Sequence, residues 1–154
     1  MDFHFFSPVN DSLVADAKIH GLGGSMRIHT TDNGFPELEG VKIAFFGVLE
    51  DRLDENPTEE PFSFDGIRRS FYDLFPGNWH IQLADLGDIQ PGESVEDTYF
   101  AVRSVVEALV KKDIIPVLLG GTQDLLYAQY RAYDNLDQMV NLVNIDSRFD
   151  LGDA

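Results

Sequence analysis

Three short apolar runs, separated by amphipathic segments, constrain the fold of this chain more than any other feature. The runs are Val41–Val48, Ile114–Leu119 and Met139–Ile145, and their composition is typical of strands buried on both faces of a parallel sheet. Between the runs, Phe64–Phe75 and Val95–Lys112 carry apolar residues at helical spacing. Because strands alternate with helices, we predict an α/β fold with three α-β-α layers and a mainly parallel sheet.

Capping signals mark where two of the helices begin. Ser94 precedes the helix at 95–112, and Asp97 stands three residues further on, so the pair predicts a capping box. A further helix follows the pair Gly120-Gly121, and either Thr122 or Asp124 is expected to cap it.

The region between the first two helices is predicted to hold one more strand. Residues Trp79–Leu83 alternate in polarity and are assigned to it, whereas the polar, Gly- and Pro-containing segment Asp85–Glu93 is predicted to be a loop. The preceding helix, Phe64–Phe75, is expected to pack through one apolar face made of Ile67, Phe71, Leu74 and Phe75.

Two further segments look less regular. Residues 1–40 have weak periodicity and are predicted to be a lead-in that packs on a main domain formed by residues 41–154. The segment Glu50–Pro61 contains six acidic residues against one arginine, and we interpret it as a solvated acidic loop. A cationic partner or substrate is the alternative interpretation of that loop.

The charge and the absence of cysteine exclude several classes of protein. The formal net charge is −16, which argues against nucleic acid and anionic membrane as partners. The chain has no cysteine, so it has neither disulfides nor thiolate metal sites. No apolar run is long enough to span a bilayer, and Met1–Asn10 lacks the positive charge of a secretory signal. We therefore expect a cytoplasmic protein.

Chemistry is expected where the predicted parallel strands end, because open α/β sheets bind ligands at the carboxyl ends of their strands. Two segments lie there, Gly120–Asp124 and Asp146–Asp150. Carboxylates such as Asp146 and Asp150 are common ligands of divalent cations. The alternative is that one aspartate caps a helix or turn and the other is solvated.

Four segments, in this order, resemble motifs of the arginase family, the ureohydrolases. The segments are Asp65–Phe71, Asp85–Asp88, Gly120–Gln123 and Asp146–Asp150, and the resemblance covers residues 41–152. It implies an arginase-like fold. In this family the last two motifs hold two manganese ions that activate a hydroxide, which attacks the carbon of an amidine or guanidine.

Carried over position by position, the resemblance leaves the metal site incomplete. Gly120 and Gly121 match the motif glycines, and Asp146 and Asp150 match two metal ligands. The two histidines of these motifs are replaced, one by Gln123 and the other by Arg148. A guanidinium only donates hydrogen bonds and cannot ligate a metal, so Arg148 is expected to bridge the two aspartates instead. We therefore expect no cofactor, and manganese only if the family site is retained.

The sequence leaves three functions open. The first is a pseudoenzyme that keeps an arginase-like fold for binding or assembly after losing its metals. The second is an active ureohydrolase, of the agmatinase or formimidoylglutamase type, with an altered metal site. The third is a structural subunit whose acidic surface meets a basic partner.

The resemblance also implies that this chain is truncated and corresponds to the N-terminal half of the family domain. In the family, the strand that precedes the second metal motif lies away from the first three strands, and strands from the C-terminal half fill the gap. A chain that ends at residue 154 is therefore expected to leave unpaired sheet edges. The partners expected are a second copy, as in a homo-oligomer, or a missing C-terminal half, and a rearranged sheet is the remaining alternative.

Overall fold

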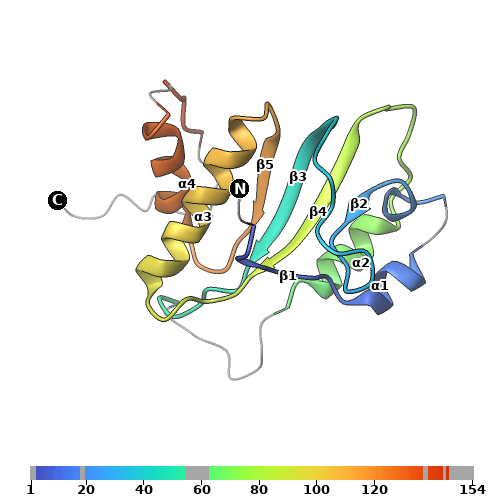
Figure 1. The fold of residues 1–154 in the computed structure, drawn as a ribbon, viewed down its shortest axis with the longest axis horizontal. Coiled ribbons are helices and arrows are strands. Elements are labelled where there is room, and N and C mark those ends of the chain that lie inside the picture. The colour runs from blue at the N-terminus through green and yellow to red at the C-terminus, as the bar shows by residue number, and fades with distance from the viewer. Residues whose placement is uncertain (1–2, 18–19, 55–62, 137–138, 144, 146–154) are drawn as a thin grey trace.

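The protein is an α/β domain built on one five-stranded sheet, as seen in a computed structural model (Figure 1). The structure describes residues 3–17, 20–54, 63–136, 139–143 and 145. In chain order its elements are β1 (Phe6–Ser7), α1 (Asp11–Asp16), a short 3-10 turn (Leu22–Gly24), β2 (Arg27–Ile28), β3 (Val41–Val48), α2 (Asp65–Tyr72), β4 (Gln82–Ile89), α3 (Val95–Val110), β5 (Ile115–Leu119) and α4 (Leu125–Asp134).

The sheet is mainly parallel and has β3 at its centre. Its strand order is β1-β4-β3-β5, and β2 also pairs with β4. Strand β3 pairs in parallel with β4 on one side and β5 on the other, whereas β1 runs antiparallel to β4. The chain therefore reverses its direction of travel across the sheet between β4 and β5. This reversal makes the carboxyl ends of β3 and β5 a topological switch point, where open α/β sheets bind ligands.

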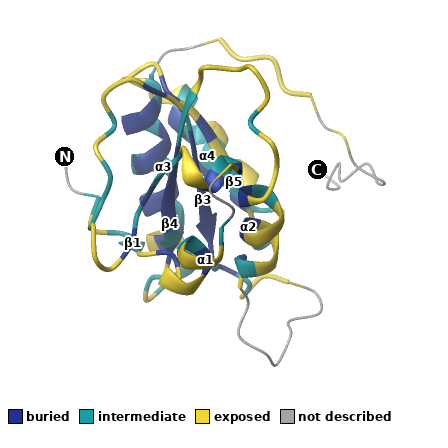
Figure 2. Cartoon of the chain, turned by 90° about the vertical axis from the view of Figure 1, so that its right-hand side faces the viewer, coloured by how far each residue is buried: buried dark blue, intermediate teal, exposed yellow. Residues whose placement is uncertain are grey.

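Helices cover both faces of the sheet, which confirms the predicted three-layer α/β class. Helices α3 and α4 pack on one face, and α1 and α2 lie on the other (Figures 1 and 2). Side chains of β3 and β4, among them Phe46 and Leu86, form the main core with Val102 and Val106 of α3. Figure 2 shows the buried residues concentrated on the strands and on the inner side of α3.

The predicted capping box begins helix α3. The Ser94 hydroxyl accepts a hydrogen bond from the Asp97 backbone N–H (3.2 Å), and Asp97 Oδ2 accepts one from the Ser94 backbone N–H (2.9 Å). Two of the otherwise unpaired N–H groups of the helix terminus are thereby satisfied.

The prediction for the second strand was wrong in position. Strand β4 covers Gln82–Ile89, so most of it lies in the segment predicted to be a loop, and Trp79 and Ile81 precede it. Asp85 and Asp88 made this segment look like an exposed loop in the sequence, because carboxylates are rarely buried without partners. Here their charge is compensated by an arginine of α2.

Helix α2 also buries a different face from the one predicted. It ends at Tyr72, and its buried residues are Arg68 and Tyr72. Of the predicted apolar face, Phe71 is half-buried, whereas Ile67, Leu74 and Phe75 are exposed. The helix turns its polar residues inward because they bond to the carboxylates of β4.

The predicted strand Met139–Ile145 is not formed in its described residues, 139–143 and 145. Met139, Leu142, Val143 and Ile145 are all strongly exposed. A strand needs a neighbour to satisfy its backbone groups, and among the described strands β5 pairs with β3 alone.

The first forty residues contribute to the sheet itself through β1 and β2, both paired with β4. The segment predicted to be an irregular lead-in therefore contains two short strands of the sheet. None of the helices in the described part of the chain has the length and apolarity needed to cross a membrane.

Candidate functional site

Two loops meet at the switch point of the sheet, one leaving β3 and the other leaving β5. The backbone N–H of Thr122 donates to the carbonyl oxygen of Glu50 (3.2 Å). Gly121 lies so close that a Cβ atom on it would overlap this same carbonyl group. Only glycine fits there, whereas at Gly120 the nearest atom to a Cβ would be a side-chain carbon 3.6 Å away. The two motif glycines therefore differ in role, and Gly121 is the one that lets the loops touch.

Glu50 is fully buried at this junction, which corrects the prediction of a solvated loop at its first residue. Its Oε1 accepts from the Nε (2.8 Å) and the backbone N–H (3.2 Å) of Arg52, and its Oε2 accepts from Arg52 Nη2 (2.5 Å) and the Thr98 hydroxyl (2.7 Å). The hydrogen bonds from Arg52 hold the pKa of the Glu50 carboxyl below its usual value. The loop thus begins with a buried carboxylate tied to α3, and the pattern of acidic residues alone could not distinguish it from its solvated neighbours.

Asp124 does not cap helix α4 through its side chain. The helix begins at Leu125, and Asp124 occupies the N-cap position without a capping hydrogen bond from its carboxylate. Its Oδ2 instead accepts a hydrogen bond from the hydroxyl of Tyr99 on α3. Burial and this bond raise the pKa of Tyr99, so the tyrosine stays a proton donor. The hydrogen bond between Tyr99 and Asp124 thereby holds the loop after β5 against α3.

Gln123 lies between these anchors, exposed at the carboxyl end of β5. Gln123, which the sequence resemblance matches to a histidine of the family, thus lies at the switch point, in the loop that contacts Glu50 through Thr122. Asp146, Arg148 and Asp150 lie outside the described residues, so the expected ion pair among them stays a prediction.

A second polar cluster lies under α2, formed by the other two family-like segments. Arg68 donates from Nε to Asp85 Oδ2 (2.7 Å) and from Nη1 to Asp88 Oδ2 (2.9 Å). The hydroxyl of Tyr72 donates to Asp85 (2.6 Å), and the N–H of Gly87 donates to the same carboxylate (2.9 Å). Burial raises the pKa of Tyr72, and the charge of Asp85 adds to that shift, so the phenol stays protonated. This cluster fastens α2 to β4.

Gly87 is needed in this cluster for two reasons. Its φ of +87° is unfavourable for residues with a side chain, and a Cβ would overlap the carbonyl oxygen of Ser7 on β1. The segment Asp85–Asp88 is therefore a structural element, in which both carboxylates are held by Arg68 of the other segment. Both segments are visible in the sequence, but no local pattern indicates that they bind each other.

The described part of the chain was searched for side chains that could hold a metal ion together. No group of three or more His, Asp or Glu side chains in the described ranges is arranged to hold an ion. None of the four histidines in the chain lies in the four family-like segments, and His29 Nδ1 lies 2.9 Å from the carbonyl oxygen of Leu86. That contact packs the N-terminal segment against β4.

A doubly covered, mainly parallel sheet with two loops meeting at its switch point defines an α/β protein of the class that builds its sites at strand ends. Residues 42–154 match the sequence profile of the Arginase family, which spans most of the chain. The chain belongs to the arginase family.

Relatives of known function give the same assignment at low identity. The chain is 24% identical over 132 residues to formimidoylglutamase of Streptococcus gordonii, covering 80% of this chain and 40% of that protein. It is 30% identical over 93 residues to formimidoylglutamase of Macrococcus caseolyticus, covering 58% of this chain and 30% of that protein. The chain thus spans about two-fifths or less of the length of these relatives.

The fold is also that of a solved ureohydrolase structure. Agmatine ureohydrolase of Thermoplasma volcanium superposes with a TM-score of 0.56 at 24% identity, covering 80% of this chain and 41% of that one. This likeness confirms the predicted arginase-like fold over the part of that structure that the chain covers.

Proposed function

We propose that this chain is a binding or assembly protein of the arginase family that has lost the family's dinuclear metal site. The observation that carries the proposal is Gln123, which stands at the carboxyl end of β5 where the family resemblance requires a histidine. A neutral amide is a poor substitute for an imidazole, which together with carboxylates suits manganese.

The carboxylates beside Gln123 are held by the protein itself, which supports the proposal. The Glu50 carboxylate accepts four hydrogen bonds, which matches the roughly four lone-pair positions of a carboxylate. The Asp124 carboxylate is engaged by Tyr99. Both carboxylates therefore accept hydrogen bonds from the protein where a metal ligand would donate lone pairs to an ion.

Arg148 adds a chemical argument from the sequence. At the second histidine position it brings a permanent cation between Asp146 and Asp150, and a cation there repels divalent ions. We propose that Arg148 pairs with these aspartates in place of the metals. This donor set does not fit a pair of manganese ions.

An active ureohydrolase of the agmatinase or formimidoylglutamase type is the second candidate. Its support is the retention of Asp146 and Asp150, two of the ligands expected from the family resemblance, together with the names of the relatives. On this alternative the site binds metal through carboxylates and hydrolyses an amidine.

Metal binding separates the two candidates. The purified chain is incubated with excess Mn²⁺, desalted and measured by elemental analysis, and we expect less than about 0.1 manganese per chain. Two manganese ions per chain would contradict the proposal. The variant Q123H/R148H restores both imidazoles and is expected to bind Mn²⁺ more tightly than the wild type.

A matched control makes the same two types of substitution, Gln→His and Arg→His, on helix α4 instead. The variant Q129H/R131H introduces two histidines by the same types of substitution, away from the switch point, and is expected to leave Mn²⁺ binding unchanged. Hydrolysis of agmatine and formimidoylglutamate is assayed in parallel with added Mn²⁺. Turnover by the wild type that the substitution D146N abolishes would establish the alternative.

A further inference from the structure

The first two turns of helix α3 hold the loops that follow the three long parallel strands of the sheet, β3, β4 and β5. Each loop leaves the carboxyl end of its strand, so together the loops frame the switch point. The contacts are made by two consecutive residues of α3, Thr98 and Tyr99, on the face of the sheet that α3 covers. One short stretch of helix therefore touches all three of these loops.

Thr98 joins the loops after β3 and β4. Its hydroxyl donates to Oε2 of Glu50 in the first loop (2.7 Å) and accepts from the backbone N–H of Gly92 in the second (3.0 Å). Arg52 links the same two loops, because its Nη2 donates to Glu50 (2.5 Å) and its Nη1 donates to the carbonyl oxygen of Glu93 (3.1 Å). A hydroxyl that donates and accepts at the same time fixes both neighbours relative to its own helix. Thr98 and Glu50 are both fully buried, so water does not compete for these bonds.

Tyr99 holds the loop after β5. Its hydroxyl donates to Oδ2 of Asp124, the residue that precedes helix α4. Its ring packs edge-on against the ring of Tyr127 on α4, with the two centroids 6.3 Å apart. Because Tyr99 follows Thr98 directly in the chain, the loop after β5 is attached to the same turn of α3 as the other two loops.

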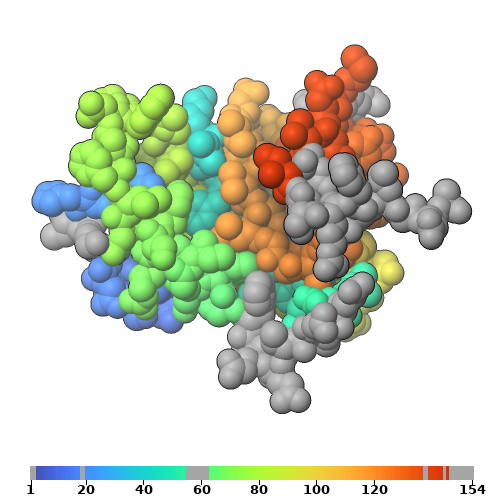
Figure 3. All heavy atoms as spheres, turned by 180° about the vertical axis from the view of Figure 1, so that it is seen from behind, coloured from blue at the N-terminus to red at the C-terminus, as the bar shows by residue number. Residues whose placement is uncertain are grey.

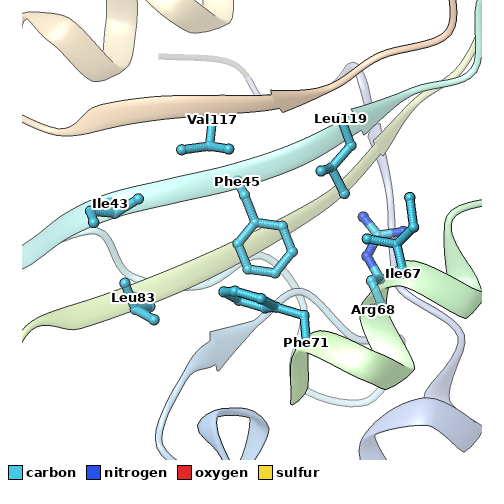
Figure 4. A pocket seen from close by; sticks show the side chains of 8 residues that line it. All are labelled: Ile43, Phe45, Ile67, Arg68, Phe71, Leu83, Val117 and Leu119. Atoms are coloured by element: carbon cyan, nitrogen blue, oxygen red, sulfur yellow. The ribbon is translucent and has the colours of Figure 1, made fainter. Parts of the chain in front are cut away.

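The opposite face of the sheet does not offer comparable contacts. Figure 3 shows β3 between the segment that includes α2 and β5 on that face. A groove of about 360 Å³ lies there, and Figure 4 shows the eight side chains that line it, which are apolar apart from Arg68. The guanidinium of Arg68 is bonded to Asp85 and Asp88 of β4. The bonds from Thr98 and Tyr99 to the loops therefore have no counterpart among the side chains that line this groove.

Gln123 lies between two of these attachments. On one side of it, Thr122 donates its backbone N–H to the carbonyl oxygen of Glu50 (3.2 Å). On the other side, Asp124 is held by Tyr99. Both chain neighbours of Gln123 are thus tied to α3, one through Glu50 and the other directly. A residue with both neighbours anchored to a packed helix is held at a defined position, which is what a binding site requires of its residues.

We propose that Thr98 and Tyr99 are positioning residues of the switch-point site, and that they set where residue 123 stands relative to the carboxyl ends of β3, β4 and β5. They act through Glu50 and Asp124, so they determine the position of residue 123 and not the chemistry of its side chain. This inference deepens the proposed binding role of the site and rests on it. The motion of residue 123 decides the inference, whereas metal content decides the proposed function, so the two fail separately.

A single label at residue 123 tests the proposal, because the chain contains no cysteine. The variant Gln123→Cys is labelled with a nitroxide, which the exposed position accommodates, and electron paramagnetic resonance gives the rotational correlation time of the label. We expect slow motion of the label in this variant. Addition of Thr98→Val or Tyr99→Phe, each of which removes a hydroxyl and keeps the rest of the side chain similar in shape, is expected to shorten the correlation time by about 2-fold or more, because a loop freed from its anchor moves faster.

Three controls separate positioning from a general loss of stability. Thr98→Ser keeps a hydroxyl at residue 98 and is expected to leave the motion of the label unchanged. Val106→Ala opens a cavity in the core under the same helix but removes none of the loop contacts, so the label at residue 123 should again be unaffected. A label at Tyr130→Cys, an exposed position of α4 (47%), should not respond to Thr98→Val or Tyr99→Phe.

Tyr99→Phe decides the test even if Thr98→Val does not fold, because it removes one hydroxyl from a half-buried side chain and keeps the ring. Three results would overturn the proposal. They are fast motion of the label in Gln123→Cys alone, an unchanged correlation time on Tyr99→Phe, or an equal change on Val106→Ala.

Discussion

The guanidinium of Arg68 lies 2.7 Å from the carboxylate of Asp85, and neither side chain is exposed to solvent. The pair joins the first turns of α2 to the middle of β4 across 17 residues of sequence. Tyr72 and Gly87 complete the hydrogen bonding of Asp85, and Asp88 takes the other side of the guanidinium. One ion pair thus joins two of the family-like segments in the folded chain.

Substitution of Arg68 by methionine is expected to lower the free energy of unfolding by about 3–5 kcal/mol. The change removes one partner and leaves Asp85 buried without its countercharge, which costs far more than a surface ion pair is worth. Methionine and arginine have similar helix propensities, so α2 itself is not weakened. Denaturation in urea measures the difference.

The matched control for this prediction is the next residue on the same helix. Arg69 pairs with Asp16 at 3.4 Å, and both side chains are more than half exposed. Arg69→Met should therefore cost less than about 1 kcal/mol. Equal losses of unfolding free energy in the two variants would show that the buried ion pair stabilises the protein no more than the exposed pair does.

Gly121→Ala is expected to destabilise the protein by about 1–3 kcal/mol or more, because the new methyl group overlaps the carbonyl of Glu50. Gly120→Ala has room for the same methyl group, since the nearest atom is a leucine side-chain carbon at 3.6 Å. Thermal unfolding of the two variants provides the comparison. A larger effect at Gly120 than at Gly121 would contradict the contact between the two loops.

Ser94→Ala is expected to cost about 1 kcal/mol through loss of the capping box at α3. Ser104 lies in the middle of the same helix, where its hydroxyl bonds back to the carbonyl of Phe100 (2.7 Å). Ser104→Ala should be neutral or slightly stabilising, because alanine is the better helix former. The two unfolding free energies, measured side by side, separate capping from helix propensity.

The sequence predicted elements whose signals are local. Strand β3 runs from Val41 to Val48 as predicted, and α3 starts at its predicted cap, because continuous apolar runs and capping residues act within a few positions. The position of Gly121 and Gln123 at the end of β5 also followed from this local pattern. The alternation of these elements was enough to establish the α/β class.

Features that depend on distant partners were not predictable. Asp85 indicated a loop rather than a strand, because its charge is compensated only by Arg68, which lies 17 residues earlier and is buried with it. Glu50 looked like one more solvated acid, and its burial depends on Thr98 of α3. The segment Met139–Ile145 shows the opposite case. Its apolar pattern is that of a strand, but a strand forms only where a neighbouring strand satisfies its backbone.

The buried carboxylate of Glu50 makes a last prediction, on the pH dependence of stability. Its pKa in the folded protein is lowered, chiefly by hydrogen bonds from Arg52, relative to the unfolded chain, where glutamate titrates near pH 4.3. The stabilisation is therefore present above about pH 4.3 and is lost as the pH falls through the lower folded pKa. Glu50→Gln should flatten the fall in unfolding free energy in that acidic range. Urea denaturation between pH 7 and pH 3 measures the slopes, and identical slopes for wild type and Glu50→Gln would contradict the depressed pKa.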